Sequence, residues 1–150
     1  MSTQTSGNLI ERIGYISETI QSWSTSEILE LTTSSQKRNT KLNITGILLV
    51  GSNYFIQILE GEPKNLLPLI EKIGLDKRHQ NLRIFSSYPD NTRLSNDWMA
   101  VIETEKLSPH AQSDLIEFKK RIEQNKITNS SLTEADIAFL RSLASPVPSN

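Results

Sequence analysis

Four polar side chains of this sequence could converge in an otherwise apolar crevice. Gln57 stands within the apolar run YFIQIL, and Tyr15 belongs to the apolar segment LIERIGYIS. Ser35 and Asn39 continue a helical stripe of apolar residues. A buried carboxamide needs partners for two donors and two lone pairs, and leaving one buried group unpaired costs about 1–3 kcal/mol. A few polar groups between apolar walls are typical of a small-molecule pocket.

A plainer interpretation exists for each of these residues. Tyr15 and Gln57 could form a structural hydrogen bond inside a core, because most buried polar side chains are paired in this way. Asn39 could simply end a helix, where asparagine is common. The charged run Asp76–His79 could be a solvated loop, which is the usual role of such a run.

Other chemistry has little support in the sequence. The chain has no cysteine, and its two histidines, His79 and His110, lie far apart without a partner at metal-ligand spacing. The glycines form neither a phosphate-binding loop nor a dinucleotide fingerprint, and no serine stands in a nucleophile elbow. Glu60 and Glu62 are better explained as residues beside a turn than as an acid–base pair. We therefore expect no enzymatic activity and no metal site.

Charge and hydropathy exclude two classes of partner. Lys and Arg number 16 against 17 Asp and Glu, so the formal net charge is −1. The protein therefore lacks the overall positive potential that attracts nucleic acid. Tyr54 and Phe55 point to opposite faces of a strand that carries no basic residue, which argues against an RNA-binding sheet. No apolar run is long enough for a membrane span, and the N-terminal residues lack the pattern of a signal peptide. We expect a cytoplasmic protein.

Residue patterns predict the elements that must position these groups. Strands are predicted over residues 9–17, 44–50, 54–59, 82–88 and 98–104 from alternating and β-branched runs, with a hairpin turn at 51–53. A first helix begins after Ser24, which has capping-box spacing to Glu27, and should end near Asn39. In the second helix Asn65 is predicted as the N-cap, which would place Pro68 in the first turn, and Gly74 as the stop.

The order of these elements is β-α-β-β-α-β-β, which is the order of a ferredoxin-like α+β fold with both helices on one face of the sheet. Two further helices should open at Ser108 and Thr133. Since Tyr54, Ile56 and Ile58 make the opposite sheet face apolar, we expect these helices or a partner chain to cover it. The predicted organisation is a disordered segment 1–8, one domain 9–104, a helical extension 105–145 and a tail 146–150.

Several segments together resemble the BLUF family, the blue-light sensors that use FAD. Arg12-x-x-Tyr15, Ser34-Ser35-Gln36 with Asn39, and Ile44-Thr45-Gly46 match in the first half of the domain. Phe55-x-Gln57-x-Leu59-Glu60-Gly61-Glu62, Asp76-x-Arg78-His79 and Arg93-x-x-x-Asp97-Trp98 match in the second. The resemblance covers about residues 9–104.

The resemblance implies a photoswitch made of Tyr15, beside the flavin ring, and Gln57, which would bridge that tyrosine to the flavin. It implies further contacts to FAD, which are Leu31, Ser35, Arg38, Asn39, Phe55, Gln57, Leu59, Ile73, Asp76, Arg78 and His79. Light would move an electron and a proton from Tyr15, and the amide of Gln57 would then rotate or tautomerise. The result would be a different hydrogen-bond pattern and a red-shifted absorption.

One segment departs from the family pattern. Where the family usually has Trp-Ser-Met, this chain has Trp98-Met99-Ala100, so either Trp98 or Met99 could relay the signal. With no output enzyme after residue 104, the output is expected to be binding to an unknown protein partner or self-association as a homo-oligomer. The apolar outer sheet face and the terminal helices are the predicted interface. The alternatives are a ferredoxin-like regulatory module for a non-flavin ligand and a small enzyme of the acylphosphatase type.

Overall fold

The computed structural model describes residues 10–90, 92–124 and 132–144. The segments predicted as a disordered N-terminus (1–8) and a tail (146–150) lie outside these residues. Within the described ranges no helix has both the length and the apolar character needed to cross a bilayer.

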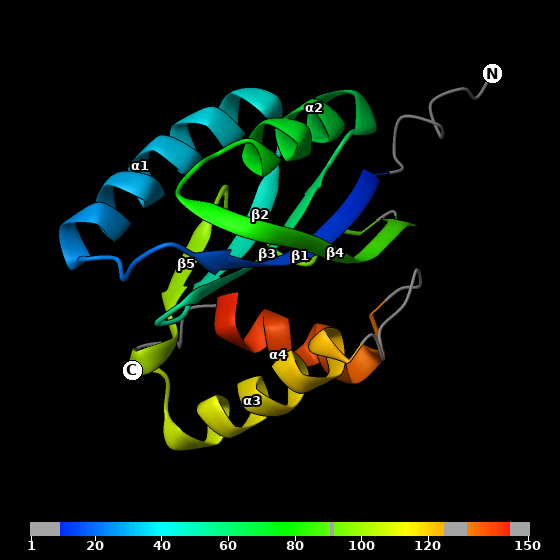
Figure 1. The fold of residues 1–150 in the computed structure, drawn as a ribbon. Coiled ribbons are helices and arrows are strands. Elements are labelled where there is room, and N and C mark those ends of the chain that lie inside the picture. Colours follow the sequence, from blue (N-terminus) through cyan, green and yellow to red (C-terminus); the bar gives the residue numbers. More distant parts are fainter. Residues whose placement is uncertain (1–9, 91, 125–131, 145–150) are drawn as a thin grey trace, which may run out of the picture.

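Five strands form one sheet in the order β4-β1-β3-β2-β5 (Figure 1). They are β1 (Ile10–Thr19), β2 (Thr45–Val50), β3 (Tyr54–Gly61), β4 (His79–Asp90) and β5 (Ala100–Glu103). β1 pairs antiparallel with β3 and β4, and β2 pairs antiparallel with β3 and parallel with β5. This arrangement confirms the predicted ferredoxin-like α+β fold.

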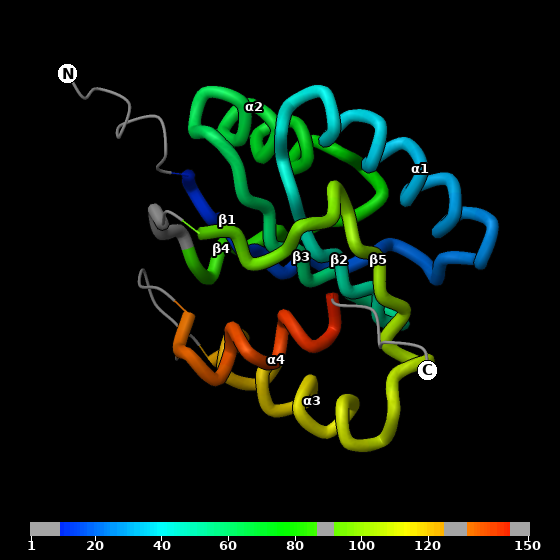
Figure 2. The backbone as a smooth tube through the Cα atoms, turned by 180° about the vertical axis from the view of Figure 1, so that it is seen from behind, coloured from blue at the N-terminus to red at the C-terminus, as the bar shows by residue number. Residues whose placement is uncertain are grey.

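Helices cover both faces of the sheet. They are α1 (Thr25–Leu42), α2 (Pro63–Gly74), α3 (Pro109–Glu123) and α4 (Glu134–Ala144), with a 3₁₀ turn, η2 (Thr104–Lys106), before α3. α1 and α2 lie on one face, and α3 and α4 lie on the other, as both views show (Figures 1 and 2). The predicted opening of the last two helices is confirmed, since Ser108 caps α3 and Thr133 precedes α4.

Alternation along β3 divides the core into two clusters. Phe55 and Leu59 join the cluster under α1 and α2. Ile56 and Ile58 join the cluster that contains Phe118 of α3 and Leu140 of α4. The chain's own terminal helices therefore cover the apolar outer face. The sheet face itself is therefore buried within the chain, whereas an interface on the terminal helices stays a prediction.

The first helix begins as predicted but ends later. Ser24 and Glu27 form a complete capping box. The helix continues past Asn39 to Leu42, and Asn43 terminates it in the left-handed conformation, with φ of 55°. Asn65 of α2 helps by donating from Nδ2 to the Leu42 carbonyl oxygen (3.1 Å). The local cap residue Asn43 and the contact from Asn65 together set this boundary.

The predicted start of the second helix is wrong. α2 begins at Pro63, with Glu62 as the N-cap, because proline suits the first helical position. The Glu62 carbonyl oxygen accepts from the backbone N–H groups of Asn65 and Leu66 (3.0 and 2.9 Å). Pro68 therefore lies inside the helix rather than in its first turn. The prediction that the helix stops at Gly74 is confirmed.

The last two strands differ from their predicted lengths in opposite directions. β4 begins at His79, three residues early, because it pairs with β1 along its whole length, from Thr19↔His79 to Ile10↔Asp90. β5 begins only at Ala100, so Trp98 and Met99 belong to the segment that leads into it. Pairing with a neighbour decides both limits, which local sequence patterns do not encode.

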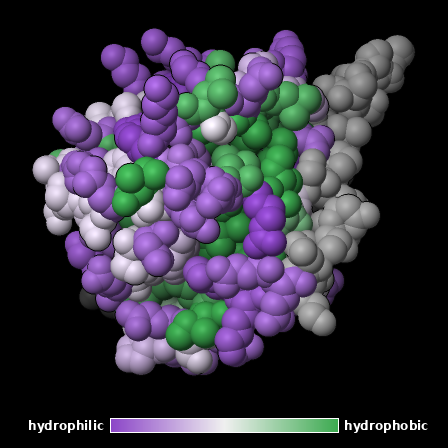
Figure 3. Space-filling model, viewed as in Figure 1, coloured by the Kyte–Doolittle hydropathy of each residue, from purple (hydrophilic) through white to green (hydrophobic). Residues whose placement is uncertain are grey.

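Apolar side chains reach the surface between α2 and the sheet (Figure 3). Among the exposed apolar residues, Leu67 belongs to α2 and Ile84 to the edge strand β4. Ile116 of α3 is exposed as well, so apolar side chains reach the surface on both helical layers.

Candidate functional site

A pocket lies between the sheet and the α1–α2 layer. Its lining residues are Tyr15, Trp23, Leu31, Ser35, Arg38, Leu48, Phe55, Gln57, Ile73, Asp76, Arg78 and His79. Its cavity volume is about 60 Å³. A larger surface cleft of about 470 Å³ adjoins it and shares Trp23, Leu31 and Arg78 with it. The walls combine aliphatic and aromatic side chains with a few polar groups, as ligand pockets do.

Tyr15 and Gln57 form a hydrogen bond on the wall of this pocket. The two residues are direct cross-strand partners on β1 and β3. The Tyr15 hydroxyl donates to Gln57 Oε1, and Gln57 Nε2 points to the sulfur of Met99 at 3.7 Å. Sulfur is a weak acceptor, so the amide is held firmly at its oxygen end and loosely at its nitrogen end. Such an amide can reverse its two ends at the cost of one strong hydrogen bond.

Burial keeps the Tyr15 phenol protonated. The ring is 2% exposed, and desolvation raises the pKa of the hydroxyl well above its ordinary value, with Arg38 opposing and Asp76 adding to this effect. Desolvation also lowers the pKa of the Arg38 guanidinium. At neutral pH the phenol is therefore a hydrogen-bond donor, which is consistent with the Gln57 oxygen facing it.

His79 is a fixed part of the pocket wall and not part of a solvated loop. It opens β4 and is 7% exposed. Its Nε2 lies 2.8 Å from the Ile73 carbonyl oxygen, and its Nδ1 lies 2.7 Å from Ser17 Oγ. Because a carbonyl oxygen only accepts, Nε2 carries a proton. These two bonds tie the end of α2 to the first strand beside the pocket.

Trp23, Phe55 and the Asp76–Arg78 pair form the mouth of the pocket. The Trp23 and Phe55 rings pack with centroids 5.3 Å apart, and the Arg78 guanidinium lies 5.4 Å from the Trp23 ring centroid. Arg78 also binds the Asp76 carboxylate through several hydrogen bonds. The side-chain hydrogen bond from Arg78 is the main reason why the pKa of Asp76 is lowered to about 2.

This pair predicts a specific acid dependence of stability. The folded-state pKa of Asp76 is below its ordinary value of 3.8, so its stabilising effect is complete above about pH 4 and is lost as the pH falls through about 2. We expect Asp76→Asn to lower the free energy of unfolding by less than about 1 kcal/mol at pH 6, because the pair is solvent-screened. Urea denaturation should show this difference vanishing near pH 2.

The exposed Asp114 of α3 supplies the matched control for that measurement. It faces His110 at 3.5 Å, and none of the arginines that the structure describes forms an ion pair with it. Asp114→Asn should not reproduce the pH-dependent difference. An Asp76→Asn difference that persists unchanged at pH 2 would contradict the assignment of this effect to the carboxylate.

Two of the predicted contact residues do not line the pocket. Asn39 is fully buried, with Nδ2 donating to the Trp98 carbonyl oxygen (2.6 Å) and Oδ1 accepting from Arg38 Nε (3.0 Å). Leu59 is buried in the inner cluster. Asn39 thus acts here as a brace between α1 and the segment before β5, and it does not end the helix.

The structure also separates the two candidate relay residues. Met99 is 1% exposed, and its sulfur meets Gln57 Nε2 while its carbonyl oxygen accepts from Gln36 Nε2 (3.1 Å). The Trp98 side chain is 38% exposed. Of these two candidates, Met99 is therefore the one that contacts the Tyr15–Gln57 pair.

Two pocket residues were not predicted from the sequence. Leu48 of β2 is the cross-strand partner of Gln57, so it shares the same sheet face. Trp23 immediately precedes the N-cap Ser24 and packs in the inner cluster with Ile28, four positions into α1. That spacing is a hydrophobic staple, a signal that could have identified Trp23.

Comparison with known proteins identifies a family. The model of the family described as BLUF, sensors of blue-light using FAD, matches residues 10–100. Among curated proteins, photoactivated adenylate cyclase subunit beta of Euglena gracilis is 33% identical over 61 residues, which are 41% of this chain. The chain spans only 7% of the length of that relative.

Solved structures agree with the family match. BlrB, a BLUF protein in its dark state, superposes with a TM-score of 0.69 at 25% identity, covering 89% of this chain and 93% of BlrB. A bacterial light-regulated adenylyl cyclase gives a TM-score of 0.70 at 27% identity, covering 94% of this chain and 42% of the cyclase.

Proposed function

Because the chain belongs to the BLUF family of blue-light sensors, whose members bind a flavin, we propose that it holds FAD non-covalently in the pocket between the sheet and α1–α2. The observation that carries this proposal is the hydrogen bond from Tyr15 to Gln57 on the pocket wall. In this proposal Tyr15 and Gln57 are the photoswitch, and the other pocket residues orient the chromophore.

The donor set of the pocket suits a flavin ring. An isoalloxazine presents two flat apolar faces and an edge with carbonyl oxygens. Leu31, Leu48 and Ile73 offer aliphatic contacts from α1, β2 and α2, and the Arg38 guanidinium and Ser35 hydroxyl offer hydrogen-bond donors from α1. The remaining contacts proposed for the ring and its ribityl chain are Phe55, Asp76, Arg78 and His79. Asn39 and Leu59 do not line the pocket, and in this proposal they support the residues that do.

The size of the pocket indicates which side chains move when the chromophore enters. Pockets for ligands of this class hold roughly 300–1,000 Å³, so the inner space of about 60 Å³ is too small without the adjoining cleft of about 470 Å³. Trp23 and Arg78 line both spaces. Leu31 lines both spaces as well. We therefore expect these three side chains to move when the two spaces join.

The switch follows from the chemistry of the two residues. Bound flavin supplies the blue-light absorption and, when excited, an electron acceptor. Tyr15 is an oxidisable phenol that can release an electron together with the proton it donates to Gln57 Oε1. While the electron and proton are away from Tyr15, the Gln57 amide would rotate or tautomerise, which exchanges its donor and acceptor ends. Both would then return to Tyr15, so that only the hydrogen-bond pattern, and not the net charge or oxidation state, is changed. Within a water-poor site these two patterns are distinct states.

Met99 is the first residue to sense this exchange. In the observed arrangement Gln57 Nε2 faces the Met99 sulfur. A reversed amide would present its oxygen to the sulfur, and that contact is unfavourable because both atoms are acceptors. The reversal should therefore displace Met99 and the segment that leads into β5.

The remaining parts of this proposal concern output. We propose a sensor domain over 9–104 and an output extension over 105–145, with no catalytic activity of its own. The signal would change binding to a protein partner or the assembly of a homo-oligomer, without nucleic acid or membrane. A cytoplasmic location stays a prediction.

The spectrum of the purified protein tests this function. We expect a yellow protein that releases FAD on heat denaturation and whose absorption shifts reversibly to the red under blue light. Reconstitution with FMN or riboflavin compares the three flavins. A colourless protein that takes up no flavin would favour the alternative, a regulatory module for a non-flavin ligand.

A further inference from the structure

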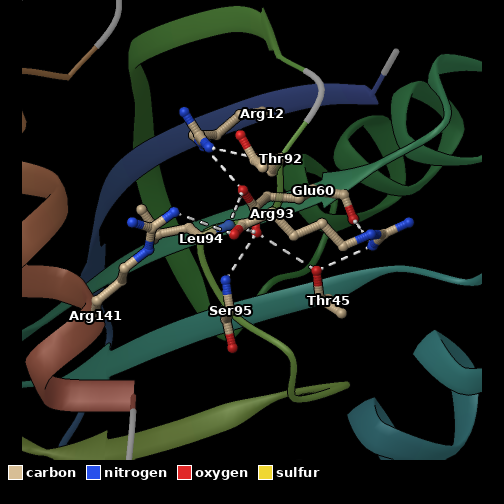
Figure 4. Close-up of polar contacts among 8 residues, drawn as sticks. All are labelled: Arg12, Thr45, Glu60, Thr92, Arg93, Leu94, Ser95 and Arg141. Carbon is tan, nitrogen blue, oxygen red and sulfur yellow. Dashed lines mark hydrogen bonds and ion pairs between the residues drawn. The ribbon is translucent and has the colours of Figure 1, made fainter. Parts of the chain in front are cut away.

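A second polar cluster lies on the other face of the sheet, around the buried carboxylate of Glu60 (Figure 4). Glu60 is 1% exposed and continues the outward series of Ile56 and Ile58 along β3. Its cross-strand neighbours are Arg12 on β1 and Thr45 on β2. The photoswitch described above uses none of these three residues.

Glu60 holds the segment 92–95 to the sheet. Its carboxylate accepts from the backbone N–H of Leu94 (2.8 Å to Oε1, 2.6 Å to Oε2) and from that of Ser95 (3.2 Å). Arg12 Nε binds the same carboxylate at 2.9 Å, and Thr45 Oγ1 lies 3.4 Å away. Four donors therefore meet a group that accepts about four hydrogen bonds and donates none.

Two arginines complete the attachment. Arg12 Nη2 donates to the Thr92 carbonyl oxygen (3.0 Å). Arg93 turns back to the sheet and donates to Thr45 Oγ1 (3.0 Å) and to the Glu60 carbonyl oxygen (3.1 Å). Arg93 Nη2 also donates to the carbonyl oxygen of Asn43, the C-cap of α1 (3.0 Å). The segment 92–95 is thus fixed at several points, to one residue row of the sheet and to the end of α1.

The same segment is in contact with α4. The Leu94 side chain is 4% exposed and belongs to the outer core cluster with Leu140 of α4. Arg141 of α4 donates to the Arg93 carbonyl oxygen (3.4 Å), as Figure 4 shows. A displacement of the Leu94 backbone would therefore move a side chain that supports α4.

The segment also leads directly to the photoswitch. It continues through Asp97, whose carbonyl oxygen accepts from Gly46 N (3.1 Å), to Met99 beside Gln57. Glu60 itself is three residues beyond Gln57 on β3, with its side chain on the opposite face. Residues 92–99 thus join the inner face of the sheet, at Met99, to the outer face, at Leu94.

We propose that Glu60 is a positioning residue for signal output, which couples the movement of Met99 to α4 by holding the backbone of Leu94 and Ser95. This inference rests on the proposed photoswitch. The carboxylate suits this role, because an apolar residue at this position would leave the backbone N–H groups of Leu94 and Ser95 without their acceptor and the segment would no longer be fixed to the sheet.

Hydrogen exchange measured by mass spectrometry, in the dark and under blue light, tests the coupling in the full flavin-loaded chain. In the wild type we expect light to change exchange in peptides covering 92–99 and 134–144. Glu60→Gln removes the charge and half of the acceptor capacity. It should keep the flavin red shift but lose most of the light-induced change in 134–144.

Glu62→Gln is the matched control, because Glu62 is two residues further along the chain and makes no side-chain cap bond. It should retain the α4 response. Leu94→Ala tests the same coupling in a second way, because it removes the side chain that packs in the cluster with Leu140 of α4 but leaves the Glu60 carboxylate and its donors in place. It should preserve the response of 92–99 and lose that of 134–144. In the dark, β1 and β3 should remain strongly protected from exchange in both test variants, although Glu60→Gln weakens the Arg12–Glu60 pair between them. This protection separates lost coupling from general unfolding.

Three outcomes would overturn the inference. The first is a full α4 response in Glu60→Gln, and the second is an equal loss in Glu62→Gln. The third is a wild type that shows the flavin red shift without any change in 134–144. A wild type that binds flavin but shows no red shift would instead refute the proposed function, and the coupling with it.

Discussion

Tyr15→Phe is expected to retain bound flavin and to lose the light-induced red shift completely. The substitution removes the hydroxyl that donates to Gln57 Oε1 and leaves the ring in its place on β1. Without the hydroxyl the side chain has no proton to release, and a phenyl ring is a much poorer electron donor than a phenol. Flavin content and absorption difference spectra before and after blue light measure the two effects separately.

Tyr54→Phe provides the control for this result. Tyr54 lies on the opposite face of the sheet, where its ring contacts Lys119 of α3. This variant should keep both the flavin and the red shift. A Tyr15→Phe protein with an intact photocycle would refute the role of the phenol in the switch.

Gln57→Leu is expected to abolish the red shift as well, for a different reason. Leucine has a similar volume but cannot exchange donor and acceptor ends, so the pocket would have only one hydrogen-bond state. The variant should still bind flavin through the other walls of the pocket. Transient absorption should show that the excited flavin decays without forming a long-lived red-shifted product.

The same variant carries a predicted stability effect. Gln57→Leu leaves the buried Tyr15 hydroxyl without its acceptor, which should lower the free energy of unfolding by about 1–3 kcal/mol. Adding Tyr15→Phe should recover much of this loss, because both partners of the bond are then apolar. Denaturant melts of the two single variants and the double variant measure this.

Gln80→Leu is the corresponding control, because Gln80 is exposed on β4. It should change neither the red shift nor the stability by a comparable amount. If Gln57→Leu retained a full light response, the amide could not be the switching group.

Much of this protein was predictable from local pattern. Alternation in YFIQIL placed Gln57 and Phe55 on one face and Ile56 and Ile58 on the other, as the two core clusters show. The capping box at Ser24 marked the start of α1. These features depend only on the period of a strand or on the few residues of a helix end, which the sequence displays directly.

The ends of elements, and the partners of polar groups, depend on contacts between distant residues. His79 belongs to a strand because β1 supplies its hydrogen bonds, and α1 passes Asn39 because that amide binds the Trp98 carbonyl oxygen. The choice of Met99 over Trp98 beside Gln57 has the same origin. The sequence by itself determined the fold class and the two faces of the strands, and it pointed to Tyr15 and Gln57 as the proposed switch residues. Only the tertiary structure decided that Glu60 binds the backbone of the 92–95 segment and that α3 and α4 cover the outer face of the sheet. Both features depend on contacts between residues far apart in the chain, which are buried away from water only when the chain has folded.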